Sequence, residues 1–115
     1  MTELKNKVVW ITGASSGIGE ALVYAFAKQG AFIVLSARRV NELERVVKTA
    51  NLNSTNSLII PFNLTDTSKA LDYTNQIIQK FGRIDILINN GGQSQRAEVI
   101  HTTTEEERQL FEINY

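Results

Sequence analysis

Short apolar runs that alternate with helical segments are the feature that most constrains this chain. Three segments between the runs carry apolar residues at helical spacing, over 17–29, 40–50, and from Thr65 or Asp66 to Phe81. The runs are rich in β-branched residues and are the expected strands: Val8–Ile11, Phe32–Leu35, Leu58–Ile60 and Ile84–Ile88. This alternation predicts right-handed βαβ units. Because the runs are continuously apolar, we expect an α/β, doubly wound parallel sheet with helices on both faces.

The apolar face of each predicted helix is expected to pack on the sheet. These faces comprise Ile18, Leu22, Ala25 and Phe26, then Leu43, Val46 and Val47, then Leu71, Ile77 and Ile78. Thr104 and Glu107 have the spacing of a capping box and predict a last helix running to Tyr115. The sheet would then be truncated after its fourth strand and the start of the following helix. Such an end leaves 84–88 as an open apolar edge, which favours association.

Composition excludes several classes of function. Lysine plus arginine and aspartate plus glutamate both total 12, so charge gives no argument for nucleic acid or an anionic membrane as partner. The absence of cysteine excludes disulfides and thiolate sites, and the single histidine, His101, favours a loop role over metal ligation. No apolar run approaches the ~20 residues that span a bilayer. The expected location is therefore cytoplasmic, by default.

A glycine-rich loop, Thr-Gly-Ala-Ser-Ser-Gly-Ile-Gly over residues 12–19, joins the first strand to the first helix. A pyrophosphate needs free backbone N–H groups without intruding Cβ atoms, and a helix N-terminus supplies both N–H groups and positive charge. A ligand-free glycine turn is the alternative, but the position in the first βαβ unit favours phosphate binding. The expected contacts are Thr12, Gly13, Ser15, Ser16, Gly17, Ile18 and Gly19.

Three motifs together resemble the short-chain dehydrogenase/reductase family. The spacing Thr-Gly-x-x-x-Gly-x-Gly is the first, and Asn89-Asn90-Gly91-Gly92 is similar to the family's Asn-Asn-Ala-Gly with one glycine in place of alanine. Ile113-Asn114-Tyr115 is similar to the segment that carries the family's catalytic asparagine. The resemblance covers essentially the whole chain. It implies a Rossmann-like NAD(P)-binding domain over residues 1–115 with strand order 3-2-1-4, the catalytic C-terminal part being absent.

The end of the second predicted strand indicates which nicotinamide cofactor is bound. It reads Ser36-Ala37-Arg38-Arg39, and no acid occurs before Glu42. An NAD site places a carboxylate there for the ribose 2′-hydroxyl, whereas an arginine fork binds the 2′-phosphate of NADP. We therefore expect NADP(H) rather than NAD(H), with Arg38 as the main contact and Arg39 as the secondary one. The alternative is that both arginines are solvated residues that open the next helix.

The resemblance implies further cofactor contacts. Asn63 and Leu64 would flank the adenine, although many relatives have aspartate at the first of these positions. Asn90 would bind the cofactor ribose, next to Gly91 and Gly92, and Asn89 would tie neighbouring strands together. A plain turn is the alternative interpretation of residues 89–92.

The resemblance also implies the chemistry, which is hydride transfer between the nicotinamide and an alcohol or carbonyl substrate. In the family a tyrosine, with its pKa lowered by a lysine four residues on, transfers the proton, and a serine orients the carbonyl. Asn114 is the only member of the catalytic set in this sequence, so the fragment alone is expected to be inactive. Tyr24 and Lys28 match the letter pattern, but they lie in the first helix and are expected to point away from the sheet.

Relatives suggest a lipophilic small-molecule substrate and a homo-oligomer for the full-length protein. Two other functions stay open at this point. One is a non-catalytic dinucleotide-binding module, if the natural chain is complete at 115 residues. The other is a methyltransferase-type nucleotide domain, which usually has an acid at the end of its second strand. Residues 37–39 argue against this last class.

Overall fold

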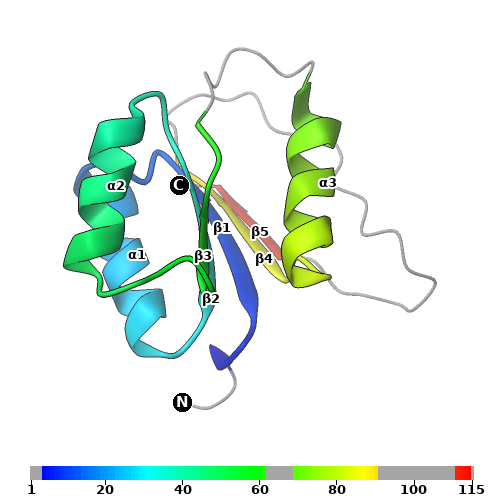
Figure 1. Cartoon of the computed structure of the whole chain (residues 1–115), viewed down its shortest axis with the longest axis horizontal. Coiled ribbons are helices and arrows are strands. Elements are labelled where there is room, and N and C mark those ends of the chain that lie inside the picture. Colours follow the sequence, from blue (N-terminus) through cyan, green and yellow to red (C-terminus); the bar gives the residue numbers. More distant parts are fainter. Residues whose placement is uncertain (1–3, 62–68, 91–110, 115) are drawn as a thin grey trace.

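The computed structural model describes residues 4–61, 69–90 and 111–114, and its sheet has the strand order β3-β2-β1-β4-β5 (Figure 1). All four strand pairs are parallel, which confirms the predicted α/β class and the order 3-2-1-4. The elements, in chain order, are β1 (Val8–Thr12), α1 (Gly17–Lys28), β2 (Phe32–Ser36), α2 (Val40–Thr49), β3 (Ser57–Ile59), α3 (Ala70–Phe81), β4 (Ile86–Asn89) and β5 (Phe111–Asn114). Among the described residues, no helix has the length and apolar character needed to cross a membrane.

Helices cover both faces of the sheet, with α1 and α2 on one side and α3 on the other (Figure 1). The side chains of successive strand residues therefore pack on opposite faces of the sheet, in two separate hydrophobic cores. Strand residues facing α1 and α2 are Val9, Ile11, Ile33, Leu35 and Ile88. Those on the α3 side are Val8, Trp10, Val34 and Leu87. Each is at most 3% exposed, which explains why the strands are apolar at every position instead of at alternate ones.

The buried face of α1 differs in part from the predicted one. Leu22 and Phe26 pack against the core as expected, but Val23 is the fully buried side chain of this helix. Ile18 is 49% exposed, and Ala25 is exposed as well. Tyr24 was expected to point away from the sheet, but it is half-buried and packs against the same core. The reason is that the buried face of α1 is centred on Val23, so it is rotated by about one residue from the face predicted from the sequence.

The other two helices follow their predicted faces more closely. In α2, Leu43 and Val46 are buried and Val47 is half-buried against the same core. In α3, Ile77 is buried and Ile78 packs against the second core. Leu71, however, is 61% exposed, because it lies in the first turn of α3, beyond the residues that reach the sheet. The predicted caps of α3, at positions 65 and 66, lie outside the described residues.

The end of the chain differs from the prediction. Residues 111–114 form β5 and not the end of a helix, and β5 pairs in parallel with β4, from Ile86 opposite Phe111 to Asn89 opposite Asn114. Positions 104–110 lie outside the described residues. The prediction of an open edge at β4 is therefore also wrong. The outer N–H and C=O groups of β4 need partners, and the backbone of 111–114 supplies them.

Candidate nucleotide-binding site

The carboxyl ends of β1, β2 and β4 meet at one edge of the sheet, and the glycine loop is held between them. Ala14 donates its N–H to the carbonyl oxygen of Ser36, at the end of β2, over 3.1 Å. Gly13 turns the chain off β1 with a φ of +63°, and a Cβ built on it would lie 2.0 Å from the carbonyl oxygen of Asn90. Only glycine fits a turn this close to β4. The loop is thereby fixed at the switch point where doubly wound sheets bind ligands.

The hydroxyl of Thr12 ties the loop to β4. It accepts the N–H of Asn90 at 2.9 Å, and its proton faces Asn89 Oδ1 at 3.3 Å and the Ile88 carbonyl oxygen at 3.4 Å. Asn90 also donates its side-chain amide to the carbonyl oxygen of Gly13, at 3.3 Å. Thr12 is only 4% exposed, so these bonds form in a largely dry environment. The expected link between β1 and β4 is made by Asn89, and Asn90 contacts the glycine loop directly.

The loop and the start of α1 offer a row of backbone donors. In the described part of the chain, the N–H groups of residues 15–19 donate no hydrogen bond, and the first helical bond of this region runs from Glu20 to Ser16. Ser16 is the N-cap residue, and its side chain makes no capping bond. A Cβ on Gly17 would meet nothing within 4 Å, so the backbone is open to an approaching ligand there. Free N–H groups at a helix N-terminus fit an anion such as a pyrophosphate.

The end of β2 carries two exposed cations. The guanidinium groups of Arg38 and Arg39 make no ion pair or hydrogen bond with any residue that the structure describes. The first acid after β2, Glu42, is already bound to the Nε atom of Arg45 at 3.0 Å. Ser36, the last residue of β2, lies two positions before Arg38. It is fully buried, and its hydroxyl oxygen accepts the indole N–H of Trp10 at 2.9 Å. A buried hydrogen bond therefore anchors the end of β2 to β1, and the two guanidinium groups that follow it are exposed.

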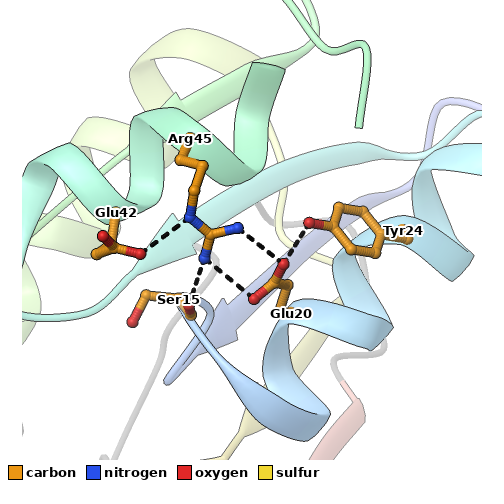
Figure 2. Close-up of polar contacts among 5 residues, drawn as sticks. All are labelled: Ser15, Glu20, Tyr24, Glu42 and Arg45. Carbon is orange, nitrogen blue, oxygen red and sulfur yellow. Dashed lines mark hydrogen bonds and ion pairs between the residues drawn. The ribbon is translucent and has the colours of Figure 1, made fainter. Parts of the chain in front are cut away.

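A further arginine, Arg45, lies beside the loop with a set of polar partners that was not predicted from the sequence. We call this set the arginine cluster, and its other members are Ser15, Glu20, Tyr24 and Glu42. Arg45 of α2 donates from Nη2 to the Ser15 carbonyl oxygen at 3.1 Å and to Glu20 Oε1 at 3.2 Å (Figure 2). Its Nη1 atom binds Glu20 Oε2 at 3.1 Å, and the hydroxyl of Tyr24 donates to that same oxygen. These partners are 25 and 30 residues from Arg45 in the chain. The pairs with helical spacing in the sequence are Glu42 with Arg45, at i,i+3, and Glu20 with Tyr24, at i,i+4.

Electrostatics follows from these contacts. The hydrogen bond from Arg45, followed by the one from Tyr24, lowers the pKa of Glu20 below its ordinary value. The same carboxylate raises the pKa of the Tyr24 hydroxyl. The family's proton-transferring tyrosine needs the opposite shift, and Lys28 is exposed. These observations support the prediction that Tyr24 and Lys28 are not a catalytic pair.

The structure brings most of the predicted site residues to one place. Those gathered around the loop are Thr12, Gly13, Ser15, Ser16, Gly17, Ile18, Gly19 and Asn90, with Arg38 and Arg39 beyond the neighbouring strand. Four predicted residues lie outside the described part: Asn63, Leu64, Gly91 and Gly92. Asn114 is the last residue of β5, and its backbone is in register with Asn89.

Comparisons of sequence identify relatives. A family model described as short chain dehydrogenase matches residues 7–115. The human protein named dehydrogenase/reductase SDR family member 7 is 51% identical over 98% of this chain and 34% of its own length. A Drosophila melanogaster protein, named dehydrogenase/reductase SDR family protein 7-like, is 37% identical over 98% of this chain and 36% of its own length. The chain thus spans about a third of the length of these curated relatives.

Solved structures agree with the sequence matches. L-sorbose reductase from Gluconobacter frateurii, complexed with NADPH and L-sorbose, superposes with a TM-score of 0.70 at 33% identity, covering 82% of this chain and 36% of that protein. A short chain dehydrogenase/reductase from Burkholderia phymatum, in complex with NAD, gives a TM-score of 0.72 at 28% identity, covering 80% of this chain and 33% of that protein. The chain therefore belongs to the short-chain dehydrogenase family of oxidoreductases.

Proposed function

We propose that the protein uses NADP(H) to transfer a hydride between the nicotinamide and an alcohol or carbonyl substrate. One observation carries the proposal, which is the row of unpartnered N–H groups over residues 15–19 at the start of α1. Ser16, Gly17 and Ile18 are exposed, so an approaching ligand can reach their N–H groups, whereas Ser15 is half-buried and Gly19 is buried. An anion would accept from several of these N–H groups at once. The negative charge of a dinucleotide pyrophosphate fits this group of donors and the positive end of the helix.

The choice of NADP(H) rests on the end of β2. Relatives with this fold bind either NADPH or NAD, so we expect the side chains beyond this strand to make the selection. A carboxylate there would accept from a ribose 2′-hydroxyl and repel a 2′-phosphate. Arg38 and Arg39 are instead exposed cations without a partner among the described residues. A guanidinium binds a phosphate through charge-assisted hydrogen bonds, so this pair favours the phosphorylated cofactor.

The bound nicotinamide would supply or accept the hydride, and the residues of this chain would bind and orient the cofactor. We assign the pyrophosphate to residues 12–19, the 2′-phosphate to Arg38 and Arg39, and the ribose to Asn90. By the family resemblance, Asn114 holds a water molecule in the proton path. By the same resemblance, a tyrosine with a lysine four residues on would transfer the proton, and a serine would orient the substrate carbonyl. A lipophilic alcohol or carbonyl compound is the proposed substrate class.

Equilibrium titration of the full natural protein with NADPH, NADH and S-adenosylmethionine tests the proposal. We expect NADPH to bind most tightly and S-adenosylmethionine not to bind. Arg38→Ala should reduce the preference for NADPH over NADH about tenfold, since one exposed charge-assisted contact is worth ~1.4 kcal/mol. Arg39→Ala should have a smaller effect. Lys48→Ala is the matched control, because it removes an exposed cation from the last turn of α2.

Two results would contradict the proposal at different levels. Equal affinity for NADH and NADPH in the wild type would overturn the role of Arg38 while leaving a dinucleotide site. A lack of affinity for every pyridine nucleotide would overturn the whole assignment.

A further inference from the structure

We propose that Arg45 is a positioning residue for the glycine loop, acting on the pyrophosphate without touching it. The inference rests on the proposed dinucleotide function. Arg45 reaches from α2 to both the loop, at the carbonyl oxygen of Ser15, and the first turn of α1, at the carboxylate of Glu20 (Figure 2). These two contacts have separate consequences for the backbone donors of residues 15–19.

The contact with Ser15 sets the orientation of a peptide plane. All described peptide bonds are trans, and in a trans peptide the C=O and the following N–H point in opposite directions. Because Arg45 Nη2 holds the Ser15 carbonyl oxygen at 3.1 Å, the N–H of Ser16 points away from the guanidinium. That N–H is one of the unpartnered donors. Without Arg45, this exposed loop peptide is free to rotate and present its oxygen, which would repel an anion.

The contact with Glu20 removes an unfavourable charge. Glu20 lies in the first turn of α1, directly after the free donors. An acid at this position is stabilising for an empty helix but repels a bound pyrophosphate. Arg45 binds both carboxylate oxygens, at 3.1 and 3.2 Å, and Tyr24 donates to one of them. The carboxylate is thus neutralised and drawn towards α2.

The geometry requires an arginine. The Nε atom binds Glu42 on the same helix at 3.0 Å, which fixes the guanidinium plane, while the two Nη atoms reach the loop and α1. A lysine ammonium is a single point charge and cannot hold these three directions at once. A simple surface ion pair would instead stabilise the fold slightly and leave the ligand unaffected. The two interpretations therefore differ in their effect on nucleotide binding.

The test measures affinity for NADPH and NADH in variants of the full natural protein. Arg45→Ala should weaken both cofactors by the same factor, about tenfold, because it acts on the pyrophosphate they share. The preference for NADPH should not change, in contrast to Arg38→Ala. Arg45→Lys should fold and bind with intermediate affinity. The double variant Glu20→Gln/Arg45→Ala should bind more tightly than Arg45→Ala alone, since the repelling charge is gone. Lys48→Ala is again the matched control.

Phosphorus NMR of bound NADPH gives a readout that a purely structural role would not move. Arg45→Ala should shift the two pyrophosphate resonances and leave the 2′-phosphate resonance in place, and Arg38→Ala should do the reverse. Wild-type affinity and wild-type spectra in both Arg45→Ala and Arg45→Lys would overturn this inference while the proposed function stands. If the wild-type protein itself binds no pyridine nucleotide, the proposed function fails and this inference fails with it.

Discussion

Replacing Thr12 by valine tests whether the site depends on a single buried hydroxyl. Valine has nearly the same shape, so the substitution creates no cavity and removes only polar contacts. Its main effect is on the N–H of Asn90, which loses its acceptor at 2.9 Å. Thr12 also gives up its contacts of 3.3 and 3.4 Å with β4.

The expected cost follows from these contacts. A buried donor left without a partner costs ~1–3 kcal/mol, while the two long contacts are near the limit of a hydrogen bond and contribute little. We therefore expect Thr12→Val to lower the free energy of unfolding by ~2 kcal/mol. The release of Asn90 from Thr12 should also loosen its contact with Gly13 and weaken NADPH binding.

Urea denaturation gives the change in stability, and amide hydrogen exchange at Asn90 locates it. Thr12→Ser is the matched control, because it keeps the hydroxyl and loses only a methyl group. Exchange at Asn90 should accelerate in the valine variant and stay at the wild-type rate in the serine variant. The reasoning is refuted if the valine variant keeps both wild-type protection at Asn90 and a stability within ~0.5 kcal/mol of the wild type.

Three further predictions concern the loop, the arginine cluster and the core. Gly19→Ala places a Cβ 2.0 Å from the carbonyl oxygen of Gly13, so α1 must shift. Denaturation should show a loss of ~1–3 kcal/mol, and titration should show weaker NADPH binding. The pKa of Glu20 is lowered by folding, so the stability it contributes is present above its unfolded pKa of 4.5 and is lost as the pH falls through the folded pKa. Tyr24→Phe removes one cause of that lowered pKa. Denaturation at a series of pH values should therefore show that the variant is less stable than the wild type above pH 4.5, and that the difference in unfolding free energy shrinks as the pH falls below 4.5. Leu43→Ala, at a fully buried position, should cost ~2–5 kcal/mol by the same measurement without altering the preference for NADPH.

The sheet could be predicted from the sequence because its signals are local. A strand covered by helices on both faces must be apolar at every position, and 8–11 and 32–35 show this directly. The glycine loop could also be predicted, because its glycines have a fixed spacing in the sequence. The structure explains two of them, since a side chain at Gly13 or Gly19 would collide with neighbouring backbone. The right-handed crossover then leaves few possible strand orders.

The arginine cluster could not be predicted, because its members come from three separate parts of the fold. Arg45 contacts Ser15 in the loop and Glu20 in α1, and neither contact has a fixed spacing in the chain. The error in α1 has a similar origin. A helical pattern defines a stripe only to within one residue, and both Ile18 and Leu22 are compatible with a face centred on either of two neighbouring positions. The structure selects Val23 because that side chain faces β1 and β2.

The last strand shows how a tertiary interaction can replace a helix that was predicted to continue through residues 111–114. The spacing of Thr104 and Glu107 favours a helix, and such a capping box contributes about 1 kcal/mol. Residues 111–114, by contrast, pair with β4, where Leu87 and Ile88 are buried, and they satisfy backbone groups that would be costly to leave unpaired. The sequence of 111–114, Phe-Glu-Ile-Asn, alternates apolar and polar residues and is compatible with a strand. Whether residues 111–114 form a helix or a strand therefore depends on their pairing with β4, which is distant in the sequence. In the described sheet β4 therefore lies between β1 and β5, and the two outer strands are β3 and β5.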